Sequence, residues 1–520
     1  MKNRNLRHPL RRLMCCLLTG AALLGLNGCA GIPPEEKDIP SLPPVQSRYT
    51  APDGDIPVGE ERMYTLYLPG KNGMHLTAQH VTLGPDALQE TLESLVWDLL
   101  SYESNDLVDS LGKGRVLSLF GPDPVELSGG VCTVNLGSSA LQLNYQDFYT
   151  LSLALASTLC ELEAVDSVNV LVAGQSVGLD ITGVLPMGSL TAHPGENLPV
   201  LWERMEARRT PMGQNMSRTA MSSYVTVYFP LENGQGITCE NRMLSFEGQT
   251  PQQMTNTILE TMSAGSMYLT GVPDMPNLSS LMLHEPLASE LADGGRLITL
   301  SFQEDVMDRL SEAGIDPTCL MAAITFSLTT FIPGTAAVSL RAGEQPITQL
   351  ESERFGTIAV LGGLMRRENF KQLLMGRTTV YFARNGVLVP CVKYVDRKQA
   401  DSPREQLAAL MEGPGARRWT DGLEPTLPEA VRPDDILGLN AVGDTLLVNL
   451  SESFRSEIQA SGPEKERLLC YSMVNTLCEN STLNHVCFFF EGEQVDNIAG
   501  EICWSGVFDR NSGLTEPSYG

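Results

Sequence analysis

One pattern occurs three times in the sequence, and this internal repeat constrains the fold more than any other feature. Each copy ends with a Thr-Leu or Ser-Leu pair, a strand of β-branched or aromatic residues and a glycine. The leucine stands 15 residues before the glycine in all three copies; the pairs are Leu159 and Gly174, Leu328 and Gly343, and Leu477 and Gly492. Because this spacing is kept without a gap, we interpret the segments as copies of one folding unit, with the glycine at a turn.

The same succession of strands and helices is predicted in each copy. Alternating or β-branched segments give an opening, a middle and a closing strand, and helical patterns lie between them. The predicted strands are 63–68, 134–136 and 168–172 in the first copy, 224–229, 298–300 and 337–340 in the second, and 378–382, 448–450 and 486–490 in the third. The order strand-helix-strand-helix-strand predicts an α+β fold, in which a small sheet has two helices packed on one face.

Capping residues mark most of the predicted helix starts. A hydroxyl, amide or carboxylate side chain before the first turn can accept the unpaired backbone N–H groups there, and proline fits the first turn. Such signals stand at Asn144, Thr250, Asp316, Ser402 and Ser461. In the first copy, the first helix is predicted from an apolar stripe that begins at Leu88.

The repeat also sets the predicted domain organisation. At about 100 to 200 residues per domain, a chain of 520 residues is expected to hold three or four. The predicted segments are a signal peptide at 1–28, a proline-rich tether at 29–60, modules at 61–190, 223–350 and 377–505, linkers at 191–222 and 351–376, and a tail at 506–520. Stacked solenoid repeats would be shorter and more regular, so we expect three modules in a row.

The N-terminal residues have the composition of an export signal. Five basic residues and no acidic one precede an apolar run of 14 residues, Leu13 to Leu26, which is shorter than the roughly 20 residues that span a bilayer. The next residues, Asn27-Gly28-Cys29, resemble with Leu26 the bacterial lipobox, in which the cysteine is acylated and becomes the mature N-terminus. Cys29 is therefore the predicted lipid-attachment site, and a plain secretory peptide with an incidental cysteine is the alternative.

Charge excludes one class of partner. The formal charge is −26, and removal of the five basic residues of the signal peptide takes it to −31. A body with this negative charge repels phosphate backbones and anionic membrane surfaces. Nucleic acid is therefore not an expected partner. Attachment to a membrane would have to come from acyl chains, because no second apolar segment of spanning length follows residue 30.

Cysteine usage argues against a disulfide framework or a metal site. Of 12 cysteines, two leave with the signal peptide and Cys29 would carry lipid. The remaining odd number cannot pair completely, and no CxxC pair is present. We expect no metal and no cofactor, and the disulfide state of the remaining cysteines is left open.

One catalytic motif occurs in the sequence. Residues 174–178 read Gly-Gln-Ser-Val-Gly, which fits GxSxG, and they follow a strand as a nucleophile elbow must. The helix that should receive the elbow is missing, because residues 179–183 are strand-like. His193 is the best-placed histidine, yet it falls in a predicted linker. We therefore predict that the chain is not an enzyme, and a hydrolase that uses Ser176 is a remote alternative.

The third copy contains a recognisable series of short segments. They are Val380-Tyr381-Phe382, residues 407–414 (Leu-Ala-Ala-Leu-Met-Glu-Gly-Pro), Leu427-Pro428-Glu429, residues 448–454 (Val-Asn-Leu-Ser-Glu-Ser-Phe) and Asn475-Thr476-Leu477. This series resembles the GerM domain of envelope lipoproteins tied to endospore formation and germination. The other copies keep the strands and helices but lack the Gly-Pro. The resemblance implies exported proteins without an established catalytic residue, and a fold similar to the ring-building motifs of sporulation-channel proteins.

From this resemblance we expect a membrane-anchored lipoprotein on the extracytoplasmic face of the cell membrane. Its expected role is non-catalytic: structural, assembly or binding work in the envelope during sporulation or spore germination. Expected partners are the membrane, through lipidated Cys29, and envelope or sporulation proteins or peptidoglycan, with an oligomer as one option. The alternative is a lipoprotein that binds a solute or peptidoglycan.

Overall fold

The structure is a computed structural model. It describes residues 49–55, 61–84, 87–179, 185–193, 195–209, 221–248, 250–292, 294–481 and 483–516. The chain from Tyr49 onward forms one compact unit. The predicted signal peptide, Cys29 and most of the predicted tether lie outside the described residues. Within the described part, no helix combines the length and hydropathy needed to cross a membrane.

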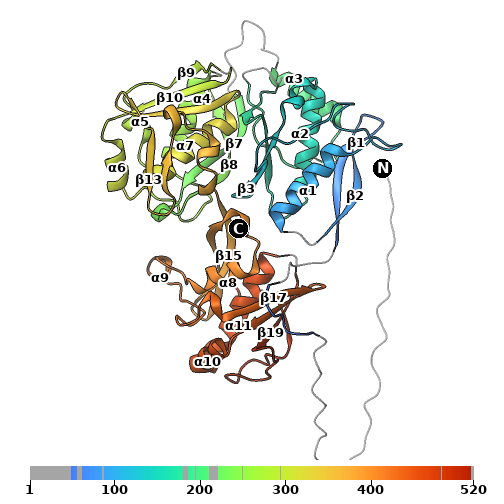
Figure 1. Cartoon of the computed structure of the whole chain (residues 1–520), viewed down its shortest axis with the longest axis vertical. Coiled ribbons are helices and arrows are strands. Elements are labelled where there is room, and N and C mark those ends of the chain that lie inside the picture. Colours follow the sequence, from blue (N-terminus) through green and yellow to red (C-terminus); the bar gives the residue numbers. More distant parts are fainter. Residues whose placement is uncertain are drawn as a thin grey trace, which may run out of the picture. The chain divides into compact units, whose positions relative to one another are not determined.

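Three similar sets of elements follow one another along the chain (Figure 1). We call the sets β1–β6, β7–β12 and β15–β20 the first, second and third modules. The first module and the helix after it contain β1 (Arg62–Pro69), β2 (Leu76–Leu83), α1 (Leu88–Ser101), β3 (Val125–Ser128), β4 (Val131–Leu136), α2 (Tyr145–Leu159), β5 (Ser167–Val172), β6 (Gln175–Ser176) and α3 (Leu198–Arg209).

The second module contains additional short helices. It comprises β7 (Met221–Pro230), β8 (Ile237–Phe246), α4 (Pro251–Ser263), α5 (Leu278–Leu281), β9 (Leu287–Glu290), β10 (Arg296–Phe302), α6 (Val306–Glu312), α7 (Pro317–Phe331), β11 (Thr335–Ala342) and β12 (Gln345–Pro346). Two strands follow it, β13 (Gln349–Ser352) and β14 (Gly356–Ala359).

The third module repeats the plan near the C-terminus. It comprises β15 (Met375–Arg384), β16 (Val387–Asp396), α8 (Pro403–Met411), α9 (Arg417–Thr420), β17 (Ile436–Val442), β18 (Thr445–Leu450), α10 (Glu452–Ser461), α11 (Pro463–Glu479), β19 (His485–Phe490) and β20 (Val507–Asp509).

Each module combines an antiparallel hairpin with a four-stranded sheet. The hairpins are β1-β2, β7-β8 and β15-β16, and the sheets run β3-β4-β5-β6, β9-β10-β11-β12 and β17-β18-β19-β20. The two central strands of each sheet are parallel and joined by the long helix α2, α7 or α11, whereas the flanking pairs are antiparallel. The predicted α+β class is confirmed.

The element order within a module is richer than predicted. The second hairpin strands β2, β8 and β16 and the first sheet strands β3, β9 and β17 were not expected, and α6 and α10 add a helix before the long one. Edge strands β3 and β9 span 4 residues each, too few to show an alternating pattern. The strand-helix-strand-helix-strand order therefore names true elements but omits their antiparallel neighbours.

Alternation along the central strands assigns one sheet face to each module's core. In the third module, the even-numbered residues from Leu446 to Leu450 join the core with the long helix, while Leu447 lies on the opposite face. Three large clusters result, spanning 66–205, 225–374 and 380–508. Val131 of β4 belongs to the second module's cluster, so the first two modules share buried apolar contact.

A repeated hydrogen bond explains the Ser or Thr in the repeat. The hydroxyl of each Thr-Leu or Ser-Leu pair accepts the backbone N–H of a tyrosine in the opening strand. The pairs are Thr158 with Tyr67 at 3.0 Å, Ser327 with Tyr228 at 2.9 Å and Thr476 with Tyr381 at 3.2 Å. Each bond ties the long helix to the hairpin and satisfies a donor that a two-stranded sheet leaves unpaired.

The register of the second copy differs from the sequence alignment. Turns of two residues follow the closing strands, at 173–174, 343–344 and 491–492. Gly343 is therefore the first turn residue, whereas Gly174 and Gly492 are the second. The middle strand is displaced as well. Phe302 pairs with Ala342, the last residue before the turn, and Leu136 pairs with Val172 at the same point of the first module. Residues 300–302, and not 298–300, match 134–136.

Three of the five predicted helix caps are confirmed. Asn144, Thr250 and Asp316 accept the expected backbone N–H groups, and Thr250 forms a complete capping box with Gln253. Ser402 precedes its helix but makes no capping hydrogen bond. Ser461 is wrong as a cap, because it is the last residue of α10, and Gly462 at φ 78° precedes α11.

The predicted linkers contain packed structure where they are described. Segment 191–222 includes α3, whose Leu198, Leu201 and Met205 are buried in the first module's core. Segment 351–376 includes β14 and buried apolar residues that pack on the second module. The described parts of both segments therefore bury apolar side chains against a module. The tail 506–520 includes β20, which pairs with β19, and the exact module boundaries stay a prediction.

Candidate functional site at the junction of the modules

The GxSxG segment begins at the second residue of the tight turn between β5 and β6. Ala173 and Gly174 adopt φ values of 49° and 80°, which suit a two-residue hairpin turn. The Ser176 side chain is buried at 7% exposure. Its hydroxyl donates to the Phe331 carbonyl at 3.2 Å, and its own carbonyl accepts from Gly334 N at 2.9 Å. Ser176 therefore joins the first module to the second.

Three of the described histidines lie beside carboxylates and not beside Ser176. His193 lies 2.9 Å from Glu196, His284 lies 3.1 Å from Glu344, and His485 lies between Asp444 and Asp509 at 3.2 and 2.5 Å. Among the residues that the structure describes, no group of three or more His, Cys, Asp or Glu side chains is placed to hold a metal ion.

The nine described cysteines are free thiols. Six are buried, two are half-buried, and Cys503 is exposed. Burial raises the pKa of Cys239 to about 12 and that of Cys160 to about 11. These thiols therefore stay protonated at neutral pH and behave as small apolar side chains.

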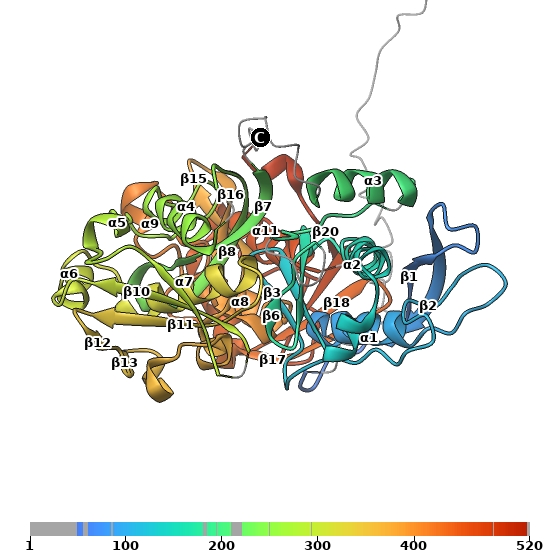
Figure 2. The ribbon, with the colours of Figure 1, turned by 90° about the horizontal axis from the view of Figure 1, so that it is seen from above.

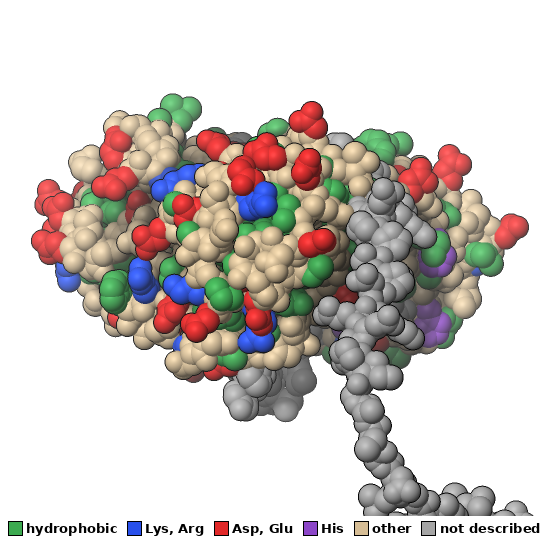
Figure 3. Space-filling view, turned by 90° about the horizontal axis from the view of Figure 1, so that it is seen from below, with side chains coloured by type: hydrophobic (Ala, Val, Ile, Leu, Met, Phe, Trp, Pro, Cys, Tyr) green, Lys and Arg blue, Asp and Glu red, His purple; other side chains and the backbone are tan. Residues whose placement is uncertain are grey.

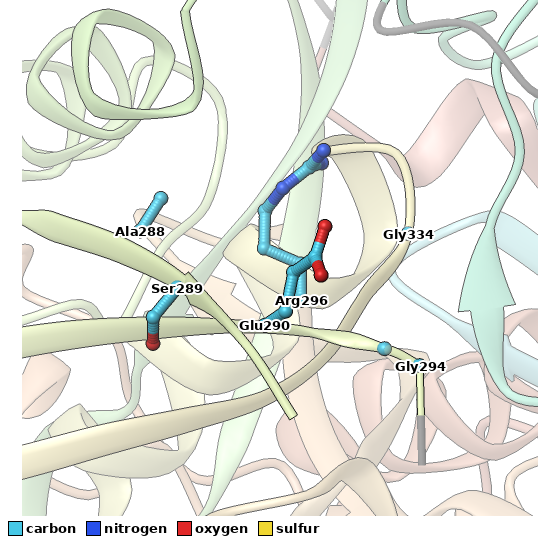
Figure 4. A pocket seen from close by; sticks show the side chains of 7 residues that line it. Ala288, Ser289, Glu290, Gly294, Arg296 and Gly334 are labelled. Carbon is cyan, nitrogen blue, oxygen red and sulfur yellow. The ribbon is translucent and has the colours of Figure 1, made fainter. Parts of the chain in front are cut away.

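One pocket of about 270 Å³ lies on the second module (Figure 4). It is lined by Ala288, Ser289, Glu290, Gly294, Gly295, Arg296 and Gly334. Figure 4 shows the Arg296 and Glu290 side chains beside the Gly334 backbone, and the guanidinium donates to the Pro333 carbonyl. With few apolar side chains to bury a ligand, this pocket is a weak candidate for a small-molecule site.

A buried charge cluster joins the first module to the segment after the second. Glu126 of β3 lies 2.6 Å from Arg367 Nη2 and 2.9 Å from Lys371 Nζ. The Glu126 and Arg367 side chains are only 7% and 4% exposed. Burial alone would raise the pKa of Glu126, but the charges of Arg367 and Lys371 outweigh it and hold the pKa below its usual value. The carboxylate is therefore ionised and fully paired.

Residues of the second module complete the surroundings of Arg367. Its second nitrogen donates to the Thr330 hydroxyl on α7, and its guanidinium carbon stands 4.2 Å from the centre of the Phe326 ring. Lys371 also donates to the Asp123 carbonyl at 2.9 Å. A guanidinium that is paired, hydrogen-bonded and stacked on an aromatic ring holds the two modules in one orientation.

A second polar cluster lies on the outer face of the first module's sheet. Asn169 of β5 donates to Thr226 of β7 at 2.8 Å, and Thr226 contacts Asn241 of β8 at the same distance. Ser189 lies 2.9 Å from Asn169 and 2.7 Å from Thr226. These neutral side chains satisfy one another where the second module's hairpin covers the first module's sheet.

The third module also contacts this junction. Ser128 of β3 donates to the Met375 carbonyl of β15 at 2.9 Å and accepts, through its own carbonyl, from the Cys239 thiol at 3.0 Å. Figures 1 and 2 both place β3 beside β8, and β3 also lies against β15. Elements of all three modules therefore meet at β3.

The third module carries an arginine equivalent to Arg367. Val338 and Val486 occupy the same position of their closing strands, where Val338 pairs with Met365 and Val486 pairs with Phe508. Arg367 follows Met365 by two residues, and Arg510 follows Phe508 by two residues. Arg510 donates to the Tyr381 hydroxyl at 3.0 Å and pairs with Glu479 of its own module. The side chains of Arg510 and Glu479 are 46% and 31% exposed, so this site faces solvent.

Acidic side chains are prominent on the molecular surface. Figure 3 shows Asp and Glu side chains spread over one face, with Lys and Arg set singly or in small groups among them. This distribution agrees with the negative formal charge of the chain, and the face shown has no basic stripe of the kind that a phosphate backbone needs.

Comparison with known families identifies part of the chain. Residues 379–496 match the sequence model of the Germane family, described as "Sporulation and spore germination". The chain carries a Germane domain. The match runs from the opening strand of the third module to just beyond its closing turn, which confirms the family resemblance of this copy. A search of curated proteins found no match.

Several solved structures are similar to parts of the chain. The tandem GerMN domains of the sporulation protein GerM from Bacillus subtilis share 16% identity, over 55% of this chain and 92% of theirs, with a TM-score of 0.20. The first GerMN domain of that protein shares 16% identity, over 26% and 97%, with a TM-score of 0.19. A protein from Clostridium perfringens assigned as a lipoprotein shares 20% identity, over 26% and 87%, with a TM-score of 0.18.

Sequence reasoning missed the residues that join the modules. Arg367 and Lys371 fall in a predicted linker, and Glu126 lies on a strand that was not predicted. One signal was present: residues 361–375 read LGGLMRRENFKQLLM, which holds more apolar residues than an exposed linker tolerates. Glu126 stands 241 positions before Arg367 and cannot be paired with these cations from one sequence, although the apolar content indicates that the segment is buried.

Proposed function

We propose that the Germane-domain chain is a lipoprotein of the extracytoplasmic membrane face, attached through Cys29, with a non-catalytic structural or assembly role in sporulation or spore germination. The family match over residues 379–496 carries the proposal. It assigns a sporulation-related domain to the third module, and the first and second modules repeat its hairpin, sheet and helices.

The junction supports a scaffold that works as one body. Glu126 and Arg367 are paired where water is excluded, and the hairpin of the second module covers the sheet of the first. Modules joined in this way present a fixed set of surfaces to a partner. We propose that partners are envelope or sporulation proteins or peptidoglycan, met within reach of a membrane tether.

The test is deletion of the gene with complementation. We expect loss of spore yield or of germination, restored by the natural sequence and by Ser176→Ala. Cys29→Ala should fail to restore it and should lose incorporation of a labelled fatty acid. Full function of the Cys29→Ala chain would refute membrane attachment. Normal spore yield and germination without the gene would refute the role itself, and loss of function in Ser176→Ala would favour the hydrolase.

Oligomerisation is tested separately on the purified mature chain. Analytical ultracentrifugation across a wide concentration range, with and without attachment to vesicles, should show self-association if the scaffold acts by assembly. A strict monomer under both conditions would leave binding of a different envelope component as the role, and a screen with peptidoglycan fragments and small solutes would then identify the component by a thermal shift.

A further inference from the structure

The outer face of the third module's sheet differs from the corresponding faces of the other modules. The same cross-strand pair of the two central strands stands at its centre in each module. This pair is Thr133 and Asn169 in the first module, Thr299 and Ser339 in the second, and Leu447 and Cys487 in the third. The third module is therefore the one whose central outer pair is apolar, and Phe489 lies on the same face.

The residues that cover this apolar face come from the other end of the chain. Tyr49 and Ala51 pack on the cluster of Leu447, Cys487 and Phe489. With this cover, and with Gln494 Nε2 donating to Cys487 Sγ at 3.1 Å, Cys487 and Phe489 are 0% and 3% exposed. Covering an apolar surface of this kind is favourable in water, so the contact holds the segment to the sheet.

Polar contacts fix the path of the same segment. The Pro52 carbonyl accepts from Asn449 Nδ2 at 3.0 Å, and Gly54 N donates to the Leu437 carbonyl at 3.3 Å. Asp55 then forms a two-pronged pair with Arg404 on α8, with distances of 2.6 and 2.7 Å. Contacts of three kinds thus follow one another along residues 49–55.

A glycine of the third module leaves room for this path. A Cβ atom at Gly438 would stand 2.7 Å from both Gly54 N and the Pro52 carbonyl oxygen. Backbone atoms cannot yield as the end of a flexible side chain can, so any larger residue at 438 would displace the segment. Residues 49–55 therefore fit the apolar face of the sheet and the space above Gly438.

We propose that residues 49–55 are a strap that occupies the outer face of the third module's sheet and so attaches the N-terminal part of the chain to the third module. The corresponding face of the first module is covered by the hairpin β7-β8. The same face of the fold thus takes a neighbouring module in one copy and the strap in another. If Cys29 carries the lipid, as proposed above, the tether reaches the body at the third module, although the first module follows it in the sequence.

A natural thiol reports the strap directly. Cys487 lies under the strap, Cys470 lies in the third module's core on the other side of the sheet, and Cys503 is exposed. Labelling of the mature chain with a thiol reagent, read by mass spectrometry, should modify Cys503 quickly and leave Cys487 and Cys470 protected. Cys470 serves as the control for unfolding of the module.

Two independent changes should release the strap. Asp55→Arg places like charges side by side at Arg404, and Gly438→Ala fills the gap beneath Pro52. In each variant, Cys487 should react roughly tenfold faster or more while Cys470 stays protected. Arg404→Asp should act as Asp55→Arg does, and the double exchange Asp55→Arg with Arg404→Asp should restore protection. Gly84→Ala is the matched control, since a Cβ there meets nothing within 4 Å.

Several results would overturn the strap. Unchanged Cys487 labelling in both Asp55→Arg and Gly438→Ala would show that the segment does not cover the face. Equal acceleration at Cys470 would show that the changes unfold the module instead. A labelling rate that depends on protein concentration would assign the covering segment to a second copy of the chain. None of these measurements needs the lipid, so failure of fatty-acid labelling at Cys29 would refute the anchor and leave the strap standing.

Discussion

Arg367, in the segment that follows the second module and packs on it, is equivalent to Arg510 of the third module, yet the two are satisfied in opposite ways. Arg510 pairs with Glu479, at the end of the long helix of its own module. In the second module the residue at that point of the helix is Thr330, and the carboxylate that pairs with Arg367 is Glu126 of the first module. One site is closed within its module, and the other is completed by a neighbour.

The difference shows how one fold provides both a free surface and a permanent joint. Because Glu126 belongs to the first module, Arg367 would be buried without a counter-charge if the first module were absent. The third module needs no such supply, and its arginine site remains partly open to solvent at 46% exposure. Moving one carboxylate from helix to neighbour therefore changes a self-contained module into one that requires its partner.

Removal of Glu126 should lower the free energy of unfolding most strongly. Glu126→Ala leaves Arg367 and Lys371 buried without a counter-charge, and we expect a loss of about 3–5 kcal/mol in the free energy of unfolding. The equivalent change Glu479→Ala removes a partly exposed pair and should cost about 1 kcal/mol or less. Urea unfolding of both variants, followed by circular dichroism, measures the difference. Equal losses would contradict the distinction between a joint and a surface site.

Acid should weaken the joint by protonating Glu126. The pKa of Glu126 is held below its ordinary value of 4.5 by Arg367 and Lys371, against the effect of burial. Stability from this group is therefore complete above pH 4.5 and is lost as the pH falls toward the lowered pKa of the folded state. The stability difference between the natural chain and Glu126→Gln should shrink as the pH falls below 4.5. A difference that stays constant to pH 3 would argue against an ionised Glu126.

The repeated hydroxyl bond offers a smaller contrast. Ser327→Ala leaves the N–H of Tyr228 without an acceptor, at a residue that is 2% exposed, and should cost about 1–3 kcal/mol. Thr158→Val removes the same bond in the first module, where Tyr67 is only half-buried, and water can replace the hydroxyl at a cost of about 1 kcal/mol or less. Thermal unfolding of the two variants ranks them, and a larger loss for Thr158→Val would show that local burial does not set the cost.

Ser176→Ala should have the smallest effect. It removes one neutral hydrogen bond between the first and second modules, and we expect a loss of about 0.5–1.5 kcal/mol. Turnover of a general ester substrate should be absent in both the natural chain and the variant. Serine-dependent turnover in the natural chain would overturn the non-catalytic assignment.

The sequence predicted the elements and contacts that recur within each copy, and it missed the contacts between different modules. The spacing of Thr158, Ser327 and Thr476 marked a true contact of the fold, because the helix and the strand that it joins recur in each copy. The pattern could not show that Ser176 lies against the second module, nor that Glu126 pairs with Arg367, because both contacts depend on how unlike segments pack. The register error at Gly343 has the same origin: spacing along the chain does not record which residue begins a turn.

The strap has a consequence for the order in which the chain folds. Pro52 accepts a hydrogen bond from Asn449, a residue 397 positions later. Synthesis proceeds from the N-terminus, so residues 49–55 emerge long before the surface that receives them exists. The strap can therefore dock only after the third module has formed its sheet. A chain that stops short of β19 leaves the strap without its site, which would make complete synthesis a condition for fixing the N-terminal tether to the body.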